Sequence, residues 1–295
     1  MSWLRWCAVL SLLLAGWAHY GAVLARTVAA IRDPFEDVSA AWLFPLVSLL
    51  DIWLHRGEFR KAVGLPSRLG FVWVSVFLAL AWSGARLGLM PFEQVSLIGL
   101  VWSVPYALWG KDTGRLMLFP AWYLLFALPV SPYLETFTHL LRTLAAGTAT
   151  GLLNGVGVDI GLFDGTRIFY GDSPDTGFCV DVADPCSGIR SLSALASGTA
   201  AYAHFCQKDR IQRWMLFACS FPVAILGNIL RILSICIVGL FFGQDATTGY
   251  FHDYSGYVFY GVALSLLFLA EKRISRLISW LDACRYGRSK DDRPT

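Results

Sequence analysis

Residues 214–242 read WMLFACSFPVAILGNILRILSICIVGLFF, and the only charged residue in this stretch is Arg231. The stretch is longer than the roughly 17–25 residues that a helix needs to cross a bilayer. The whole chain has the same character, because 56% of its 295 residues are hydrophobic and only 15% are charged. A soluble domain carries about 25% charged residues. We therefore predict an integral membrane protein.

Further apolar stretches predict an all-α polytopic membrane protein with about eight transmembrane helices. The first stretch continues through Trp17 and Leu24 without an A-x-A pattern, so we interpret it as a retained anchor, with a cleaved signal peptide as the alternative. The predicted spans are residues 6–25, 38–54, 70–85, 94–109, 116–131, 187–205, 214–242 and 255–270.

The loops between these spans predict the orientation of the chain. Basic residues fall in alternate loops and in the tail, and the positive-inside bias makes that side cytoplasmic. Both termini are then inside, and the outer segments are residues 26–37, 86–93, 132–186 and 243–254. The basic residues are Arg56, Arg60, Lys61, Arg68, Lys111, Arg115, Lys208, Arg210, Arg213, Lys272, Arg273, Arg276, Arg285, Arg288 and Lys290.

The largest outer segment, residues 132–186, is acidic and has two parts. Between Tyr133 and Asn154 apolar residues recur at helical spacing, which predicts an amphipathic helix along the outer interface. Residues 155–182 alternate weakly, with Gly and Asp between the apolar positions, and predict a short hairpin. The apolar positions of the helix are Leu134, Phe137, Leu140, Leu141, Leu144 and Ala145.

Cys186 opens span six, in the run Asp184-Pro185-Cys186-Ser187-Gly188-Ile189-Arg190. Asp184 suits an N-cap and Pro185 suits the first helical position, which predicts Cys186 in the first turn of a helix. Unpaired backbone N–H groups at a helix start favour a thiolate over a thiol. Arg190 adds positive charge on the same face. Gly188 keeps the helix surface small, so that a peptide or a neighbouring helix can approach closely.

Two further polar sites lie downstream in apolar surroundings. Arg231 lies 17 residues along span seven from Trp214, or about 26 Å at the helical rise, near the outer edge of a core roughly 30 Å thick. Cys186 and His252 stand at the outer ends of spans six and eight. The three residues therefore share one depth, and they converge if the three spans pack together. A thiol, a guanidinium and an imidazole are the parts of a cysteine acyl-transfer site.

These residues also have plainer interpretations. Cys186 is otherwise a small hydrophobe or the disulfide partner of Cys179. Arg231 is otherwise a snorkelling or structural arginine, although an ionisable residue inside a span is a functional-site hypothesis by default. Asn228, one turn earlier, is expected to orient Arg231 or to tie helices together. Asp51 has no evident partner in the sequence and is assigned no role.

The imidazole has rivals that can be compared by position. His252 is otherwise an ordinary surface histidine, and Asp253 either orients it or faces water. His204 lies 18 residues beyond Cys186 on the same span, about 27 Å away, and is excluded. His139 is outside but belongs to the amphipathic helix, and is the second choice.

Three motifs occur together in this chain. They are Cys-Ser-Gly-Ile-Arg-Ser-Leu at 186–192, Asn-Ile-Leu-Arg-Ile at 228–232, and His252 followed by Gly256. In this order they resemble the motifs of the exosortase/archaeosortase family. The stretch from Leu118-Phe119-Pro120 through Pro129, Val130 and Pro132 is also similar to the core of that family. The resemblance covers about residues 95–270.

The resemblance implies a multi-span membrane enzyme from a family proposed to be cysteine transpeptidases. Substrates of such enzymes are exported proteins with a C-terminal sorting signal like PEP-CTERM, made of a short motif, a membrane helix and a basic tail. A His at 252 places the chain with the bacterial exosortases, in the inner membrane with the site on the outer, periplasmic side. By motif, the catalytic residues are Cys186, Arg231 and His252, and the supporting residues are Asn228, Arg190, Ser187, Gly188 and Asp253.

The expected organisation has three parts: N-terminal transmembrane helices in 1–94, a catalytic membrane core in 95–270, and a basic cytoplasmic tail in 271–295. The expected partners are exported substrate proteins and membrane lipid. No basic face, zinc spacing or phosphate-binding glycine loop is present in the sequence, so we expect no nucleic acid, metal or cofactor.

Two other functions stay open. One is a non-enzymatic membrane component of polysaccharide export or assembly, linked to exopolysaccharide machinery, in which Arg231 and Asn228 bind a lipid-linked anion. The other is a transporter with Arg231 in the substrate path. A transporter of the inverted-repeat kind has broken helices in repeated halves, and the sequence shows no such repeat.

Overall fold

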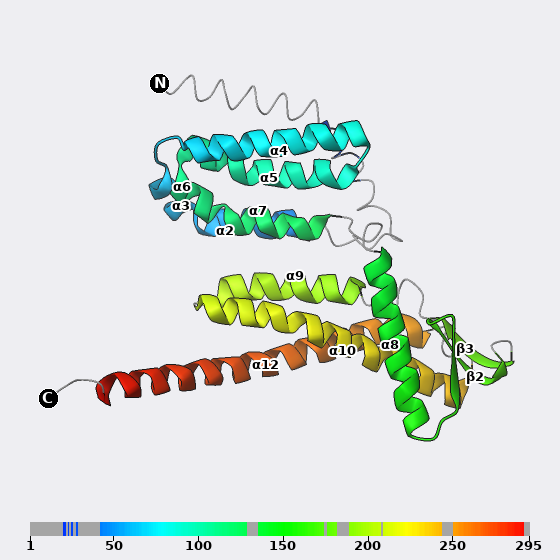
Figure 1. Cartoon of the computed structure of the whole chain (residues 1–295). Coiled ribbons are helices and arrows are strands. Elements are labelled where there is room, and N and C mark those ends of the chain that lie inside the picture. Colours follow the sequence, from blue (N-terminus) through cyan, green and yellow to red (C-terminus); the bar gives the residue numbers. More distant parts are fainter. Residues whose placement is uncertain are drawn as a thin grey trace. The chain divides into compact units, whose positions relative to one another are not determined.

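The computed structural model is mostly helical and divides into two compact units, residues 1–130 and 131–295 (Figure 1). The structure describes residues 20, 21, 23, 25, 28, 42–128, 135–173, 176–181, 189–207, 209–243 and 250–291, without the side chains of 171–173, 176–178, 181, 190, 250–253, 277 and 280–291.

In the first unit, α4 (Arg68–Leu87) and α5 (Met90–Trp109) form a helical hairpin. Ser67 caps α4, because its hydroxyl accepts the backbone N–H of Gly70 at 3.4 Å. Gly88 ends α4 in the left-handed conformation at φ 67°, which only glycine adopts readily. The predicted spans 70–85 and 94–109 are therefore confirmed as helices.

The prediction of one continuous helix over the fifth span, residues 116–131, was wrong. Pro120 has no N–H to donate to the carbonyl of Leu116, four residues earlier, and a helix ends at Leu116. Leu128 is extended at ψ 135°, as expected of a residue that precedes a proline. The chain here forms α6 (Lys111–Leu116), α7 (Leu118–Tyr123) and the 3-10 helix η1 (Leu124–Ala127).

Two shorter helices, α2 (Leu43–Leu54) and α3 (Arg56–Ala62), precede α4 in the chain, and α2 packs against α7 and η1. The hydroxyl of Ser48 donates to the carbonyl of Pro120 at 2.8 Å. Asp51 is buried, and its Oδ1 lies 3.0 Å from Nδ1 of His55. Asp51 therefore has a partner one turn along the chain, which the sequence interpretation missed.

Gly70 allows α4 and α5 to approach closely, because a Cβ at this position would lie 2.4 Å from the Cα of Ala107. We expect Gly70→Ala to lower the thermal stability of the detergent-solubilised protein, since the overpacking costs about 1–3 kcal/mol. Gly57→Ala in α3 is the matched control, because a Cβ there meets nothing within 4 Å. Equal melting temperatures for the two variants would contradict the close contact.

In the second unit, α9 (Ile189–Cys206), α10 (Arg210–Phe242) and α12 (Tyr250–Asp291) pack on one another. Residues 207–209 are the whole connection between α9 and α10, so these two helices form an antiparallel hairpin (Figure 1). Two apolar clusters lie between these helices: one is formed by Ile189, Leu192, Leu195, Ala224 and Ala263, and the other by Ala203, Leu216, Leu267 and Ile274.

α8 (Glu135–Gly155) runs crosswise to these three helices (Figure 1) and confirms the helix predicted near 133–154. The predicted hairpin has a third strand, because the structure contains an antiparallel sheet in the order β1-β2-β3. The side chain of Asn154 ties α8 to this sheet by bonding both the N–H and the carbonyl of Ile160 at 2.9 and 3.1 Å. The strands are β1 (Ile160–Phe163), β2 (Arg167–Ser173) and β3 (Thr176–Asp181).

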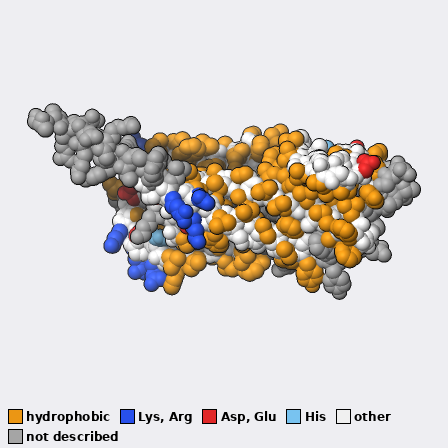
Figure 2. Space-filling view, turned by 90° about the horizontal axis from the view of Figure 1, so that it is seen from below, with side chains coloured by type: hydrophobic (Ala, Val, Ile, Leu, Met, Phe, Trp, Pro, Cys, Tyr) orange, Lys and Arg blue, Asp and Glu red, His pale blue; other side chains and the backbone are white. Residues whose placement is uncertain are grey.

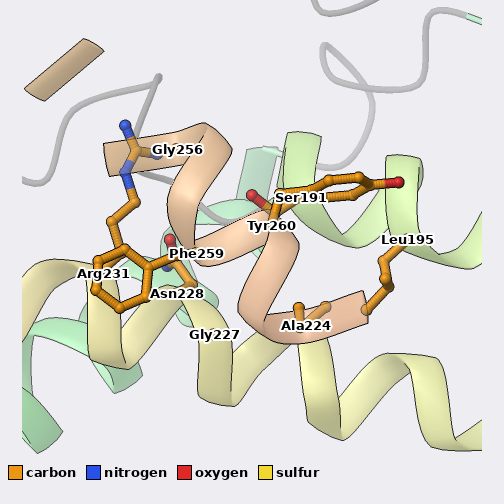
Figure 3. A pocket seen from close by; sticks show the side chains of 10 residues that line it. Ser191, Leu195, Ala224, Gly227, Asn228, Arg231, Gly256, Phe259 and Tyr260 are labelled. Carbon is orange, nitrogen blue, oxygen red and sulfur yellow. The ribbon is translucent and has the colours of Figure 1, made fainter. Parts of the chain in front are cut away.

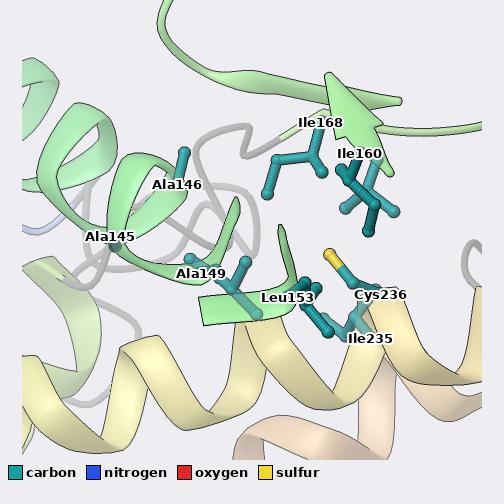
Figure 4. Close-up of a cluster of buried hydrophobic side chains, with 10 residues drawn as sticks. Ala145, Ala146, Ala149, Leu153, Ile160, Ile168, Ile235 and Cys236 are labelled. Atoms are coloured by element: carbon teal, nitrogen blue, oxygen red, sulfur yellow. The ribbon is translucent and has the colours of Figure 1, made fainter. Parts of the chain in front are cut away.

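A buried cluster fixes α8 and the sheet on the second half of α10 (Figure 4). Small residues of α8 allow the close approach, and Ile168 of β2 and Ile235 of α10 are completely buried. The predicted apolar row of α8 divides accordingly: Leu141 and Ala145 are buried, but Phe137, Leu140 and Leu144 are exposed. The cluster comprises Ala145, Ala146, Ala149, Leu153, Ile160, Ile168, Val180, Ile232, Ile235 and Cys236.

Within the described part of the chain, three helices are long and apolar enough to cross a bilayer: α4, α10 and residues Tyr254–Arg276 of α12. The described residues therefore do not confirm the predicted number of about eight spans. Many apolar side chains of these helices are exposed, including Trp82 at 63% and Tyr257 at 79%. Hydrophobic side chains are also spread over much of the face shown in Figure 2. Soluble proteins rarely expose apolar surface on this scale, so the chain is a membrane protein.

Candidate functional site

A pocket lies where α9, α10 and α12 meet in the second unit (Figure 3). Each helix contributes a polar side chain to its wall: Ser191 from α9, Asn228 and Arg231 from α10, and Tyr260 from α12. The rest of the wall is apolar or small, with Leu195, Ala224, Gly227, Gly256, Phe259 and Ala263. The cavity between these side chains is small, about 10 Å³, which is roughly the space of one water molecule.

Arg231 is the charged group of this pocket. It lies within the apolar helix α10, and only 8% of its surface is exposed. Its Nε donates a hydrogen bond to Oγ of Ser255 on α12 at 3.1 Å. Burying a guanidinium is costly unless hydrogen bonds replace those to water. The Ser255 hydroxyl, itself buried, supplies one such bond.

Asn228 lines the same pocket one turn before Arg231 and is 5% exposed. Its predicted role in orienting Arg231 stays a prediction. The next residues of α10, Ile232 and Ile235, are buried in the cluster that holds α8 and the sheet. The core cluster therefore holds the part of α10 that directly follows Arg231, and its residues are neighbours of Asn228 and Arg231 along the helix.

Cys186 lies outside the described residues, together with Ser187 and Gly188. The described part of α9 begins at Ile189, three residues after Cys186. Arg190 stands in the first turn of α9, but the structure does not describe its side chain. The expected helix start at Asp184 and Pro185, and the alternative disulfide between Cys179 and Cys186, likewise stay predictions.

The expectation that spans six, seven and eight pack together is confirmed. Ser191 of α9, Arg231 of α10 and Gly256 of α12 line one pocket, although they are far apart in the sequence. The structure thus brings the beginning of α9 and the beginning of α12 to the part of α10 that carries Arg231.

His252 and Asp253 belong to a helix, whereas we predicted an outer loop at 243–254. α12 begins at Tyr250, so both residues stand in its first turn, and His252 precedes Ser255 and Gly256 by one turn. For residues 250–254 the prediction of a loop was wrong, because hydropathy marks the apolar part of a helix and not its polar ends. α12 also continues to Asp291, past the expected boundary at residue 270. The structure does not describe the side chains of His252 and Asp253.

The rival histidines lie elsewhere among the described residues. His204 stands near the end of α9 with its ring 5.2 Å from that of Phe205. It is 13 residues beyond Ser191, or about 20 Å along the helix, in agreement with its exclusion. His139 belongs to α8, and neither histidine is among the residues that line the pocket.

The sequence interpretation missed Ser255, which bonds to Arg231, and also Ser191 and Tyr260 of the pocket wall. A serine in a helix commonly bonds to a backbone carbonyl of its own helix, as Ser265 does to Gly261 at 2.9 Å. The bond between Ser255 and Arg231 joins two helices, and no local pattern indicates it. The sequence did offer one hint that Ser255 belongs to the site, because it directly precedes Gly256, the glycine of the His252 motif.

A second polar cluster lies at the other end of these helices. The hydroxyl of Tyr202 donates to Oε1 and Oε2 of Glu271 at 3.1 and 2.9 Å, and the side-chain amide of Gln207 donates to the same carboxylate. These bonds tie the end of α9 to α12. In the described part of the chain, no three His, Cys, Asp or Glu side chains are grouped as metal ligands.

The comparisons with known proteins agree with the motifs. A family model described as transmembrane exosortase matches residues 34–269. The match begins well before residue 95, where the resemblance by motifs begins, and it includes helices of the first unit. Searches of curated proteins and of solved structures found no match. Because the family model spans most of the sequence, this chain belongs to the transmembrane exosortase family.

Proposed function

We propose that this protein is a membrane cysteine transpeptidase that cleaves a C-terminal sorting signal from exported proteins through an acyl-enzyme on Cys186. The observation that carries this proposal is the buried Arg231 at a pocket that α9 and α12 also line. Cys186 precedes α9 by three residues, and three residues of chain span at most about 11 Å. His252 stands one turn before Gly256 of the pocket. The family assignment supports the same reaction.

The reaction has two steps. The thiolate sulfur of Cys186 attacks the carbonyl carbon of the scissile peptide, and Arg231 stabilises the thiolate or the oxyanion that forms. The C–N bond then breaks, and protonated His252 gives its proton to the leaving amine. The substrate's membrane helix and basic tail leave with this amine. An acceptor next attacks the thioester, His252 takes the acceptor's proton, and the thiolate is released.

The acceptor decides the outcome of the second step. An amine or a lipid anchors the exported protein, whereas water completes a simple hydrolysis. The substrate's membrane helix is proposed to dock beside α9, α10 and α12, with its scissile bond at the outer face of the inner membrane. The exposed apolar row of α8, formed by Phe137, Leu140 and Leu144, supports a position of this crosswise helix in the lipid interface.

Co-expression with a reporter tests this function directly. The reporter carries a short motif, a membrane helix and a basic tail at its C-terminus, and the control reporter lacks the short motif. We expect the first to be shortened and the second to keep its full mass, by gel mobility and mass spectrometry of the new terminus. Reporters with motifs from several secreted proteins of the same cell are needed, and survival of all of them at full length would contradict the proposal.

A second candidate function follows from the polar groups of the pocket. Arg231 and Asn228 line it together, and such a pair suits a lipid-linked anion in a polysaccharide-export component or in a transporter. The two classes are separated by mutation. In a binding protein Cys186→Ala leaves the activity intact while Arg231→Ala abolishes it, whereas the transpeptidase requires both residues.

The proposed orientation predicts which cysteines are accessible from outside. Cys206 is exposed at the end of α9, beside the basic turn that we assign to the cytoplasm. In single-cysteine variants, we expect an impermeant maleimide to label Cys186 in cells with a permeabilised outer membrane, and Cys206 only after lysis of the inner membrane. Labelling of Cys206 before lysis would reverse the orientation.

A further inference from the structure

We infer that Ser255 is a positioning residue of the proposed reaction, and that Ser255 and Gly256 together hold the guanidinium of Arg231 in its working orientation. The inference rests on the proposed function, because it assigns Arg231 to the reacting atoms. It concerns two neighbouring residues of α12 and one residue of α10.

The first contact is the hydrogen bond from Nε of Arg231 to Oγ of Ser255 at 3.1 Å. Both partners are buried, Arg231 at 8% and Ser255 at 3% exposure. Little water is therefore present to compete for this bond, so it restrains the end of a long and otherwise flexible side chain.

The second contact is between the guanidinium and the bare backbone of Gly256. A Cβ added at this glycine would lie 3.6 Å from Cζ and Nη2 of Arg231 and 3.8 Å from Nη1. A methyl group just fits at this distance, but a larger side chain would extend into the space of the guanidinium. Figure 3 shows the arginine reaching from α10 to this glycine.

The two contacts together restrain both the direction and the plane of the guanidinium. A guanidinium is planar, so a bond at Nε and packing against its atoms also set where its two Nη groups point. A group that stabilises a developing charge must be held in place before the charge forms. His252 stands one turn earlier on the same helix as Ser255 and Gly256.

Substitution of Ser255 tests the hydrogen bond. The measurement is the cleavage rate of the tailed reporter in a pulse-chase experiment, normalised to the amount of full-length enzyme in the membrane. We expect Ser255→Ala to slow cleavage by about 10- to 100-fold, as misplaced catalytic groups do. Ser255→Thr keeps the hydroxyl and should recover most of this loss. Ser265→Ala, which removes a hydroxyl from the same helix, is the matched control and should leave the rate unchanged.

Substitution of Gly256 tests the packing and remains informative if Ser255→Ala fails to accumulate. We expect Gly256→Val to slow cleavage much more than Gly256→Ala. Gly261→Val on the same helix should not slow it, since a Cβ there meets nothing within 4 Å. A wild-type rate for both Ser255→Ala and Gly256→Val would overturn the inference. So would a slow Ser255→Thr variant that accumulates normally.

The inference and the proposed function fail in different ways. If Cys186→Ala or Arg231→Ala still cleaves the reporter, the proposed function is wrong. If both abolish cleavage while Ser255→Ala and Gly256→Val cleave at the wild-type rate, only the positioning role is wrong.

Discussion

Cys186→Ala is expected to abolish cleavage of the sorting tail while the protein still accumulates in the membrane. Loss of the attacking sulfur removes the acyl-enzyme, and removal of a covalent nucleophile typically costs about 10³-fold or more. Cys186→Ser keeps a hydroxyl but lacks a thiolate at neutral pH, so it should also be strongly impaired. The measurement is the rate of reporter shortening in a pulse-chase experiment, with membrane levels followed by immunoblot.

Cys206→Ala is the matched control for this prediction. Cys206 is exposed at the end of α9, at the opposite end from the pocket, and its replacement should leave the rate unchanged. Cleavage of the reporter by Cys186→Ala at more than a few per cent of the wild-type rate would exclude a cysteine acyl-enzyme. Direct evidence would come from mass spectrometry of a trapped thioester on the peptide that contains Cys186.

Arg231→Lys is expected to lose nearly as much cleavage activity as Arg231→Ala, although lysine keeps the positive charge. Removal of one group that stabilises an oxyanion costs about 10²- to 10³-fold. A lysine has no Nε–H at the position that donates to Ser255 and no planar group to pack on Gly256. Its charge would therefore occupy another position in the pocket.

Arg213→Lys is the control, because Nε of Arg213 also makes a hydrogen bond, to the carbonyl of Gln207 at 2.7 Å, at the other end of the helices. This variant should cleave the reporter at the wild-type rate.

Arg231→Ala also leaves the buried Ser255 hydroxyl without the Nε–H donor of Arg231, and it should lower the free energy of unfolding by about 1–3 kcal/mol. Thermal melting in detergent measures that loss. Full activity in Arg231→Lys would mean that charge alone suffices.

Much of the helical content could be predicted from the sequence, because hydropathy and periodicity are local properties. The stretches that became α4, α8 and α10 were predicted within a few residues of their observed ends. The break near Pro120 was missed although proline is a local signal, because the apolar run continues through it. Hydropathy indicates whether a segment prefers lipid or water, but it does not indicate whether the backbone hydrogen bonds of a helix continue through that segment.

The sheet shows a different limit of the sequence. Weak alternation in residues 155–182 indicated strands, but pairing of β2 with both β1 and β3 is a relation between segments. Gly and Asp between the apolar positions suggested a hairpin of two strands, and the third strand became recognisable only from its register with β2. Cross-strand pairing is non-local, so a single sequence under-determines it.

The sequence by itself determined that this is a membrane protein and that Arg231 stands within an apolar helix, because composition and spacing along one helix suffice for both. It also indicated that Asn228 lies one turn away. Only the tertiary structure decided what Arg231 contacts. Ser255 and Gly256 lie more than 20 residues further along the chain on another helix, and packing of α10 against α12 brings them to the guanidinium. The partner of a buried charge is set by the interface between helices, which no periodicity within one helix encodes.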